Sequence, residues 1–194
     1  MKKILVAAAV MACFGTAGAA EDITVDVAVI GAGGAGLSAA VQAHELGANV
    51  VVVEKMAMVG GNTVRAAGGL KGGHWLNDPA LVRTLVTKSA SSVYWLLAHG
   101  GDLRDVGLMA GASQPRTHRP TGGALVGPEV VRTLYTAAKN LKIDVRTNTH
   151  AEQILTDKSG RVVGLKVKGK DGTYTIHSKA VVDAAGGFGA NNEM

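Results

Sequence analysis

The sequence predicts an α/β fold built on a parallel sheet, and three neighbouring stretches support this prediction. Thr24–Ile30 is a short apolar run that suits a strand buried on both faces. Leu37–Leu46 is an alanine-rich stretch that suits a helix, and Val50–Val53 is a second buried strand made only of valine. A strand, a helix and a strand in this order form a βαβ unit whose two strands are parallel.

A glycine-rich turn joins the first strand to the helix. Residues 31–36 read GAGGAG, which is the pattern G-x-G-x-x-G. Gly31 permits a tight turn, Gly33 lets the backbone approach a pyrophosphate, and Gly36 lets the helix pack closely on the strand. The unpaired N–H groups and the positive dipole end of the following helix attract phosphates.

An acidic residue, Glu54, ends the second strand 23 positions after Gly31. A carboxylate at this place can accept hydrogen bonds from both ribose hydroxyls of an adenosine, and it repels a 2′-phosphate. A glycine-rich turn without a ligand is the simpler interpretation of the glycines alone. The combination of strand, turn, helix, strand and acid favours a dinucleotide site, and Glu54 suits the ribose of NAD as well as that of FAD.

The composition indicates one compact domain. The 194 residues are 47% apolar and only 4% aromatic, with 27 glycines, which excludes a disordered chain. Two of the +5 net charges come from Lys2 and Lys3, and the other basic residues are scattered. We therefore predict no nucleic-acid partner.

Met1–Ala20 has the pattern of a secretory signal peptide, with Lys2 and Lys3, an apolar stretch and small residues before Glu21. We expect a periplasmic protein whose dinucleotide-binding domain covers 21–194, with no transmembrane segment. Residues 10–13 (VMAC) leave lipoprotein anchoring as a minor alternative. Because Cys13 is the only cysteine and no group of metal ligands stands at a suitable spacing, no metal site is predicted.

Residues 54–69 read EKMAMVGGNTVRAAGG. This segment resembles the one that wraps FAD in the soluble fumarate reductases, flavoproteins related to succinate dehydrogenase flavoprotein subunits and to urocanate reductases. The resemblance continues, in the same order, through 71–85 (KGGHWLNDPALVRTL), 101–111 (GDLRDVGLMAG), 117–123 (THRPTGG) and 184–193 (AAGGFGANNE).

The resemblance implies an FAD that is held without a covalent bond. Relatives with covalent flavin carry a histidine where Asn62 stands here, and relatives usually have a threonine at position 184 or 185. The glycine turn, the acid and the resemblance together predict cofactor contacts from Gly31, Gly33, Gly34, Ala35, Gly36, Glu54, Lys55, Gly61, Asn62, Thr63, Ala67, Gly68, Gly69, Ala151, Ala185 and Gly186.

The resemblance also implies a Rossmann-like FAD-binding fold of the glutathione-reductase type, with an antiparallel β-meander inserted into the parallel sheet. Three segments rich in β formers, 151–156, 162–167 and 174–177, predict the meander. We expect 180–184 to return as the last strand of the core.

Asp78-Pro79 predicts the start of a helix that ends before Gly100-Gly101. We expect this helix to bury an apolar face formed by Leu81, Leu85, Val93, Leu96 and Leu97. A further helix is expected from Gly127-Pro128 to Lys139.

Relatives of this type reduce an activated alkene such as fumarate by hydride transfer from flavin N5. The resemblance thus implies a small dicarboxylate or enoate substrate and a cytochrome as electron donor. In relatives the arginine proton donor and the groups that grip the dicarboxylate belong to a capping domain and a returning segment. Neither is identified in this sequence, so we expect an incomplete, amino-terminal FAD-binding domain and assign no catalytic residue.

Three alternatives stay open. The chain is a non-catalytic FAD-binding fragment or a subunit that needs a separate cap; or it acts on urocanate or another enoate; or, less favoured by residues 60–69, it is an NAD-linked dehydrogenase.

Overall fold

A computed structural model describes residues 21–67, 78–108 and 112–187. The expected signal peptide and the predicted cofactor residues Gly68 and Gly69 lie outside these ranges. Within them the chain forms, in order, β1 (Ile23–Ile30), α1 (Gly34–Glu45), β2 (Val50–Val53), the 3₁₀ helix η1 (Thr63–Arg65), α2 (Pro79–Ala98), β3 (Asp105–Gly107), β4 (Thr117–Arg119), α3 (Val126–Asn140), β5 (Asp144–Arg146), β6 (His150–Thr156), β7 (Val162–Gly169) and β8 (Gly172–Asp183).

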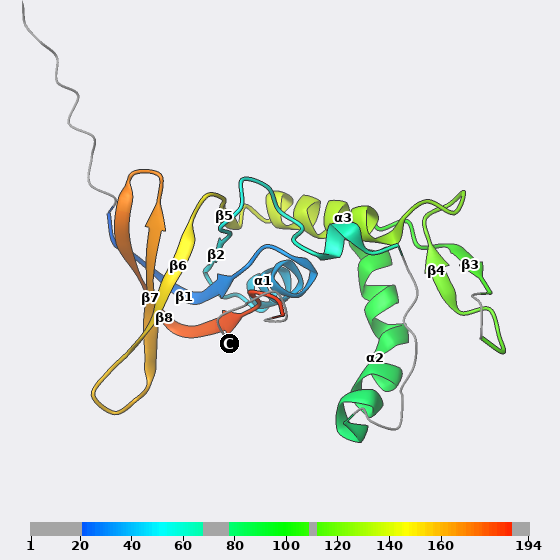
Figure 1. The fold of residues 1–194 in the computed structure, drawn as a ribbon, viewed down its shortest axis with the longest axis horizontal. Coiled ribbons are helices and arrows are strands. Elements are labelled where there is room, and N and C mark those ends of the chain that lie inside the picture. The colour runs from blue at the N-terminus through cyan, green and yellow to red at the C-terminus, as the bar shows by residue number, and fades with distance from the viewer. Residues whose placement is uncertain (1–20, 68–77, 109–111, 188–194) are drawn as a thin grey trace, which may run out of the picture.

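Six strands form one mixed sheet in the order β5-β2-β1-β8-β7-β6, and β3 and β4 form a separate antiparallel pair. The first four strands of this order are parallel, as the βαβ unit requires, and β6 and β7 are antiparallel to their neighbours. Figure 1 shows β6 and β7 at one end of the molecule and the β3–β4 pair at the other. The α/β fold class with an antiparallel meander is confirmed.

One detail of the meander differs from the prediction. The segments expected as a meander strand, 174–177, and as a separate core strand, 180–184, form the single strand β8. The first half of β8 pairs with β7, and its second half lies parallel to β1. A single strand is possible because Ser178 and Lys179, between the two segments, continue the extended backbone and the pairing with β1.

The sheet is covered on both faces. Against one face pack α1 and α3, where a buried cluster joins Leu37 and Val41 of α1 to Val29 and Val52 of the sheet and Leu134 of α3. The other face carries a second cluster, in which the meander covers β1 and β2. Strands β1 and β2 are therefore apolar along nearly their whole length because both of their faces are buried.

The expected start of α2 is confirmed, because the Asp78 carboxylate accepts a hydrogen bond from the Ala80 N–H at 2.7 Å and precedes Pro79. The expected buried face is wrong for the first half of this helix. Leu81 is 70% exposed and Leu85 is 40% exposed, and α2 contains no buried residue. Periodicity predicted the helix correctly, but within the described residues no element covers its first turns; Figure 1 shows α2 pointing away from the sheet.

Candidate functional site

In the glycine turn between β1 and α1, backbone atoms leave no room for a side chain at Gly31 or Gly36. Gly31 has φ +95°, and its N–H donates to the Val53 carbonyl at 2.8 Å. A Cβ on Gly31 would lie 2.5 Å from the Ala184 carbonyl oxygen, and a Cβ on Gly36 would overlap the carbonyl oxygen of Gly31 itself. These two glycines are therefore required by the close approach of the turn to β8 and of α1 to the turn.

Gly33 differs from its two neighbours in the motif. Its φ is −82°, and a Cβ there would meet nothing nearer than 3.7 Å. No packing inside the protein therefore requires a glycine at this position. Gly33 pairs with Gly60 and lies at the N-terminus of α1, where Ala35 is exposed. Backbone N–H groups at a helix N-terminus are the groups that bind a pyrophosphate.

Glu54 is the buried acid of the site, with 6% of its surface exposed. One carboxylate oxygen accepts the Ala32 N–H at 2.8 Å, and the other accepts the Met56 N–H at 2.8 Å. The carboxylate therefore faces the glycine turn, and no ion pair to a described residue holds it. Two carboxylate oxygens offer about four acceptor positions, so about two are left for the ribose hydroxyls of a nucleotide.

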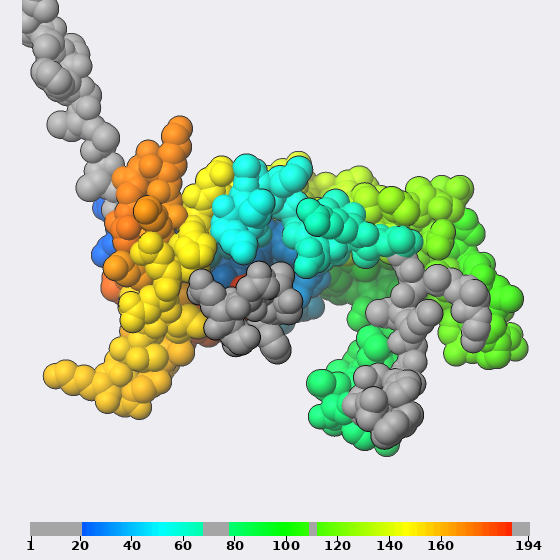
Figure 2. All heavy atoms as spheres, in the orientation of Figure 1, coloured from blue at the N-terminus to red at the C-terminus, as the bar shows by residue number. Residues whose placement is uncertain are grey.

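The segment after β2 returns to the glycine turn. The Gly60 N–H donates to the Ala32 carbonyl at 2.8 Å, and Thr63 Oγ1 accepts the Gly34 N–H at 2.9 Å. The Thr63 hydroxyl thus satisfies the first N–H of α1 and keeps its own proton for a further partner. Figure 2 shows this segment, in cyan, lying across the blue atoms of β1 and α1.

The structure brings most of the predicted cofactor residues to this one place. The glycine turn, Glu54 and the 60–63 segment are joined by the hydrogen bonds above, and Ala184 contacts Gly31, so Ala185 and Gly186 follow directly from the site. Four predicted residues, Lys55, Gly61, Asn62 and Ala67, are exposed along the same segment.

Ala151 is the predicted residue with the weakest link to this site. It lies on β6 and packs against the cluster on the meander face. It follows Thr149 by two residues, and the Thr149 N–H donates to the Glu54 carbonyl at 2.9 Å. Ala151 is thus linked to Glu54 only through the backbone at Thr149.

Sequence reasoning missed the support beneath the 60–66 segment. Gly127 and Val131, both in the first turns of α3, lie against it. The sequence signal at this position was Gly127-Pro128, which indicated only that a helix begins there.

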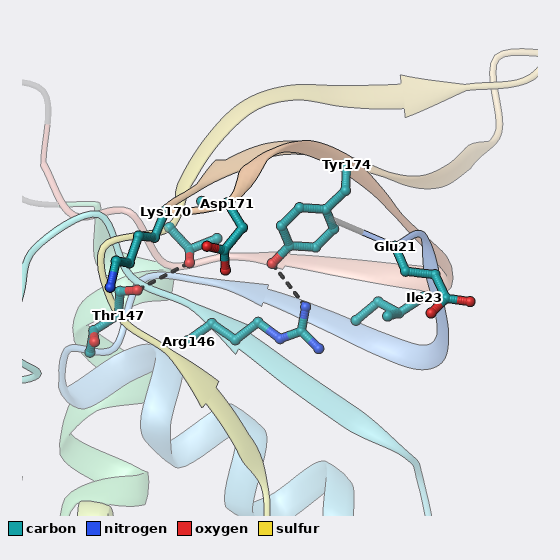
Figure 3. A pocket seen from close by; sticks show the side chains of 9 residues that line it. Glu21, Ile23, Arg146, Thr147, Lys170, Asp171 and Tyr174 are labelled. Carbon is teal, nitrogen blue, oxygen red and sulfur yellow. Dashed lines mark hydrogen bonds between the residues drawn. The ribbon is translucent and has the colours of Figure 1, made fainter. Parts of the chain in front are cut away.

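A hollow of about 550 Å³ lies on the meander face of the sheet. Figure 3 shows Arg146 from β5 reaching Tyr174 from β8 across it. The Arg146 guanidinium also donates to Asp144 at 2.8 Å. Burial lowers the pKa of Arg146, but the bonds to Tyr174 and Asp144 outweigh burial and the pKa is raised. These bonds join the edge strand to the meander, so we interpret the hollow as structural.

The site offers groups that can bind a nucleotide. The glycine turn offers amides, Glu54 offers acceptors, and the described ranges contain no group of three or more His, Cys, Asp or Glu side chains that could hold a metal ion. No helix among the described residues has the length and the apolar character needed to cross a bilayer.

Residues 26–187 match the FAD-dependent oxidoreductase family. The chain belongs to this family. It is 46% identical over 196 residues to fumarate reductase (cytochrome) of Shewanella frigidimarina, covering 88% of this chain and 34% of that protein. It is 36% identical to urocanate reductase of Eggerthella lenta, covering 88% of this chain and 33% of that protein. These relatives place it with the flavoproteins of fumarate reductase type.

The fold agrees with solved structures. The structure of the open conformation of a flavocytochrome c3 fumarate reductase superposes with a TM-score of 0.82 and 39% identity, covering 91% of this chain and 36% of that one. The Mycobacterium smegmatis Sdh1 complex superposes with a TM-score of 0.76 and 25% identity, over 88% and 35% of the two chains. The chain thus spans about a third of the length of these relatives.

Proposed function

We propose that this chain holds one FAD without a covalent bond and forms the cofactor-binding part of a reductase for activated alkenes such as fumarate. The observation that carries the proposal is Glu54, a buried carboxylate aimed at a glycine turn, with acceptor capacity left over. FAD supplies two-electron hydride chemistry when bound, whereas the protein supplies binding and orientation.

Different residues of the site bind different parts of the cofactor. The amides at the start of α1 hold the diphosphate, and Glu54 holds the adenosine ribose. The segment that begins at Gly60 passes these amides and leads on to Ala67, so it lies along the flavin half. Asn62 there offers an amide side chain and no imidazole, which supports a non-covalent flavin.

The substrate class rests on the relatives. The fumarate reductase at 46% identity supports a small dicarboxylate and, by its name, a cytochrome electron donor. The urocanate reductase at 36% identity supports a planar enoate instead. We further propose that the protein works in the periplasm, because residues 1–20 have the pattern of an export signal.

Purification of the mature protein tests the cofactor directly. We expect a yellow protein whose FAD stays in solution after acid precipitation of the polypeptide. Colourless protein that also fails to take up added FAD would contradict the proposal, and colour retained in the acid pellet would contradict the non-covalent part. Oxidation of a reduced viologen by fumarate or by urocanate then separates the two substrates.

One observation favours a second candidate, an FAD-binding subunit that works with a separate polypeptide. An apolar groove of about 490 Å³ runs between α2 and the start of α3, lined by residues such as Val86 and Val93 of α2 and Val130 of α3. FAD binding without any alkene reduction by the purified chain would favour this candidate over the reductase.

A further inference from the structure

The N-terminal turn of α3 is in direct backbone contact with the segment that follows Gly60. The Gly127 N–H donates to the Ala66 carbonyl at 3.0 Å. A Cβ on Gly127 would overlap the Thr63 carbonyl oxygen and lie 2.8 Å from that of Ala66. Both obstacles are backbone atoms, so no side-chain rotation can make room for even a methyl group.

The backbone conformation of Gly127 does not require glycine. Gly127 is the second residue of α3 and is not among the residues with positive φ. In a helix, alanine is preferred over glycine by about 1 kcal/mol. The glycine is therefore explained by space alone: it lets α3 approach Thr63 and Ala66 to backbone contact.

The same segment holds the start of α1. Thr63 contacts α3 through its carbonyl and receives the Gly34 N–H on its hydroxyl. Val131, one turn further along α3, would meet a Cβ on Gly60 at 3.3 Å. Helix α3 thus packs against residues 60–66 and supports them where they contact the glycine turn.

We infer that Gly127 is a positioning residue that sets the distance of the 60–66 segment from the glycine turn, and so the affinity for the flavin half of the cofactor. This inference rests on the proposed FAD binding. The adenosine half depends mainly on Glu54, which Gly127 does not touch, and Gly127 reaches the glycine turn only through Thr63. An added methyl group overlaps the Thr63 carbonyl oxygen and displaces Thr63 by on the order of 1 Å, which is more than the roughly 0.5 Å within which the groups of a binding site must be held.

The test compares FAD with ADP in one protein. The affinity of the wild type and of Gly127→Ala for each ligand is measured by titration calorimetry. We expect Gly127→Ala to weaken FAD binding by at least about tenfold, while ADP binding changes less than about threefold. Gly107→Ala is the matched control, because a Cβ on this half-buried glycine of β3 meets nothing within 4 Å; we expect it to leave both affinities unchanged.

Val131→Ala provides a second variant. It removes side-chain volume from the face of α3 that supports residues 60–66, whereas Gly127→Ala adds volume there. We expect it to fold and to lower the ratio of FAD to ADP affinity in the same direction, by about threefold. Unchanged FAD affinity in Gly127→Ala would overturn the inference. An equal loss of FAD affinity and of ADP affinity in both variants would also overturn it, because that result indicates a merely structural role. A wild type that binds ADP but not FAD would overturn the proposed function instead.

Discussion

The glycine-turn region and helix α2 both begin with clear local signals, yet only the first is built into the core. Leu37 of α1 is fully buried, whereas Leu81, in the first turn of α2, is 70% exposed. The β1–α1–β2 unit is enclosed by α3 on one face and by the meander on the other. The comparison teaches that caps and periodicity define where a helix lies, while burial depends on what other elements cover it.

The largest effect that separates the two regions is the removal of a leucine side chain. Leu37→Ala should lower the free energy of unfolding by about 2–5 kcal/mol, because it leaves a cavity in a closed cluster. Leu81→Ala, the matched control, should change it by less than about 0.5 kcal/mol. Urea denaturation measures both values. An equal loss of unfolding free energy in the two variants would show that the first turns of α2 are buried in solution, which would contradict the difference between the two regions.

The next effect concerns the acid of the site. Glu54→Gln replaces an acceptor by an amide N–H₂ group that faces the Ala32 or the Met56 N–H. We expect FAD affinity to fall by about tenfold to a hundredfold, since a hydrogen bond to a charged group contributes about 1.5–3 kcal/mol. Glu152→Gln, at an exposed position on β6, is the control. Equilibrium titration with FAD provides the measurement, and an unaltered affinity in Glu54→Gln would remove the ribose assignment.

The start of α2 offers a smaller effect. Asp78→Ala removes the side chain that accepts the Ala80 N–H, so we expect a loss of about 1 kcal/mol confined to this helix. Hydrogen exchange should accelerate in the first turns of α2 and stay unchanged in α1. Acceleration in both helices would mean that α2 unfolds together with the core, contrary to its exposed position.

The smallest expected effect depends on pH and lies where the two regions meet. His99, at the end of α2, contacts the Trp95 carbonyl at 2.7 Å and Glu45 of α1 at 2.8 Å. Both partners are acceptors, so this geometry favours the charged imidazole, which can donate from both ring nitrogens. Burial lowers the pKa of His99, but the Trp95 carbonyl and Glu45 outweigh it, and the pKa is raised above its ordinary value of 6.5.

A raised pKa fixes the sign of the pH dependence. The contribution of His99 to stability is fully present below about pH 6.5 and is lost as the pH rises through the higher value of the folded state. His99→Gln should therefore lower the melting temperature by up to about 3 °C at pH 5.5 and by less at pH 9. His150→Gln, at an exposed position, is the control. A deficit that grows with pH would contradict the charged imidazole.

The parts of the fold that the sequence predicted are those determined over short stretches of chain. The turn at Gly31–Gly36, the valine strand β2 and the Asp78 cap each depend on a few neighbouring residues. The exposure of Leu81 and the packing of α3 against Thr63 depend on contacts between segments that are distant in the sequence. Gly127 shows this difference, because its neighbour Pro128 indicated a helix start while its function depends on Thr63, far away in the chain.

The most direct test of the site is an amide NMR spectrum of the protein recorded with and without FAD. We predict that FAD shifts the amide signals of Gly33, Gly34 and Ala35, together with those of residues 60–66, and leaves Leu81 and Leu85 unchanged. Shifts concentrated in α2, with the glycine turn unaffected, would contradict the account.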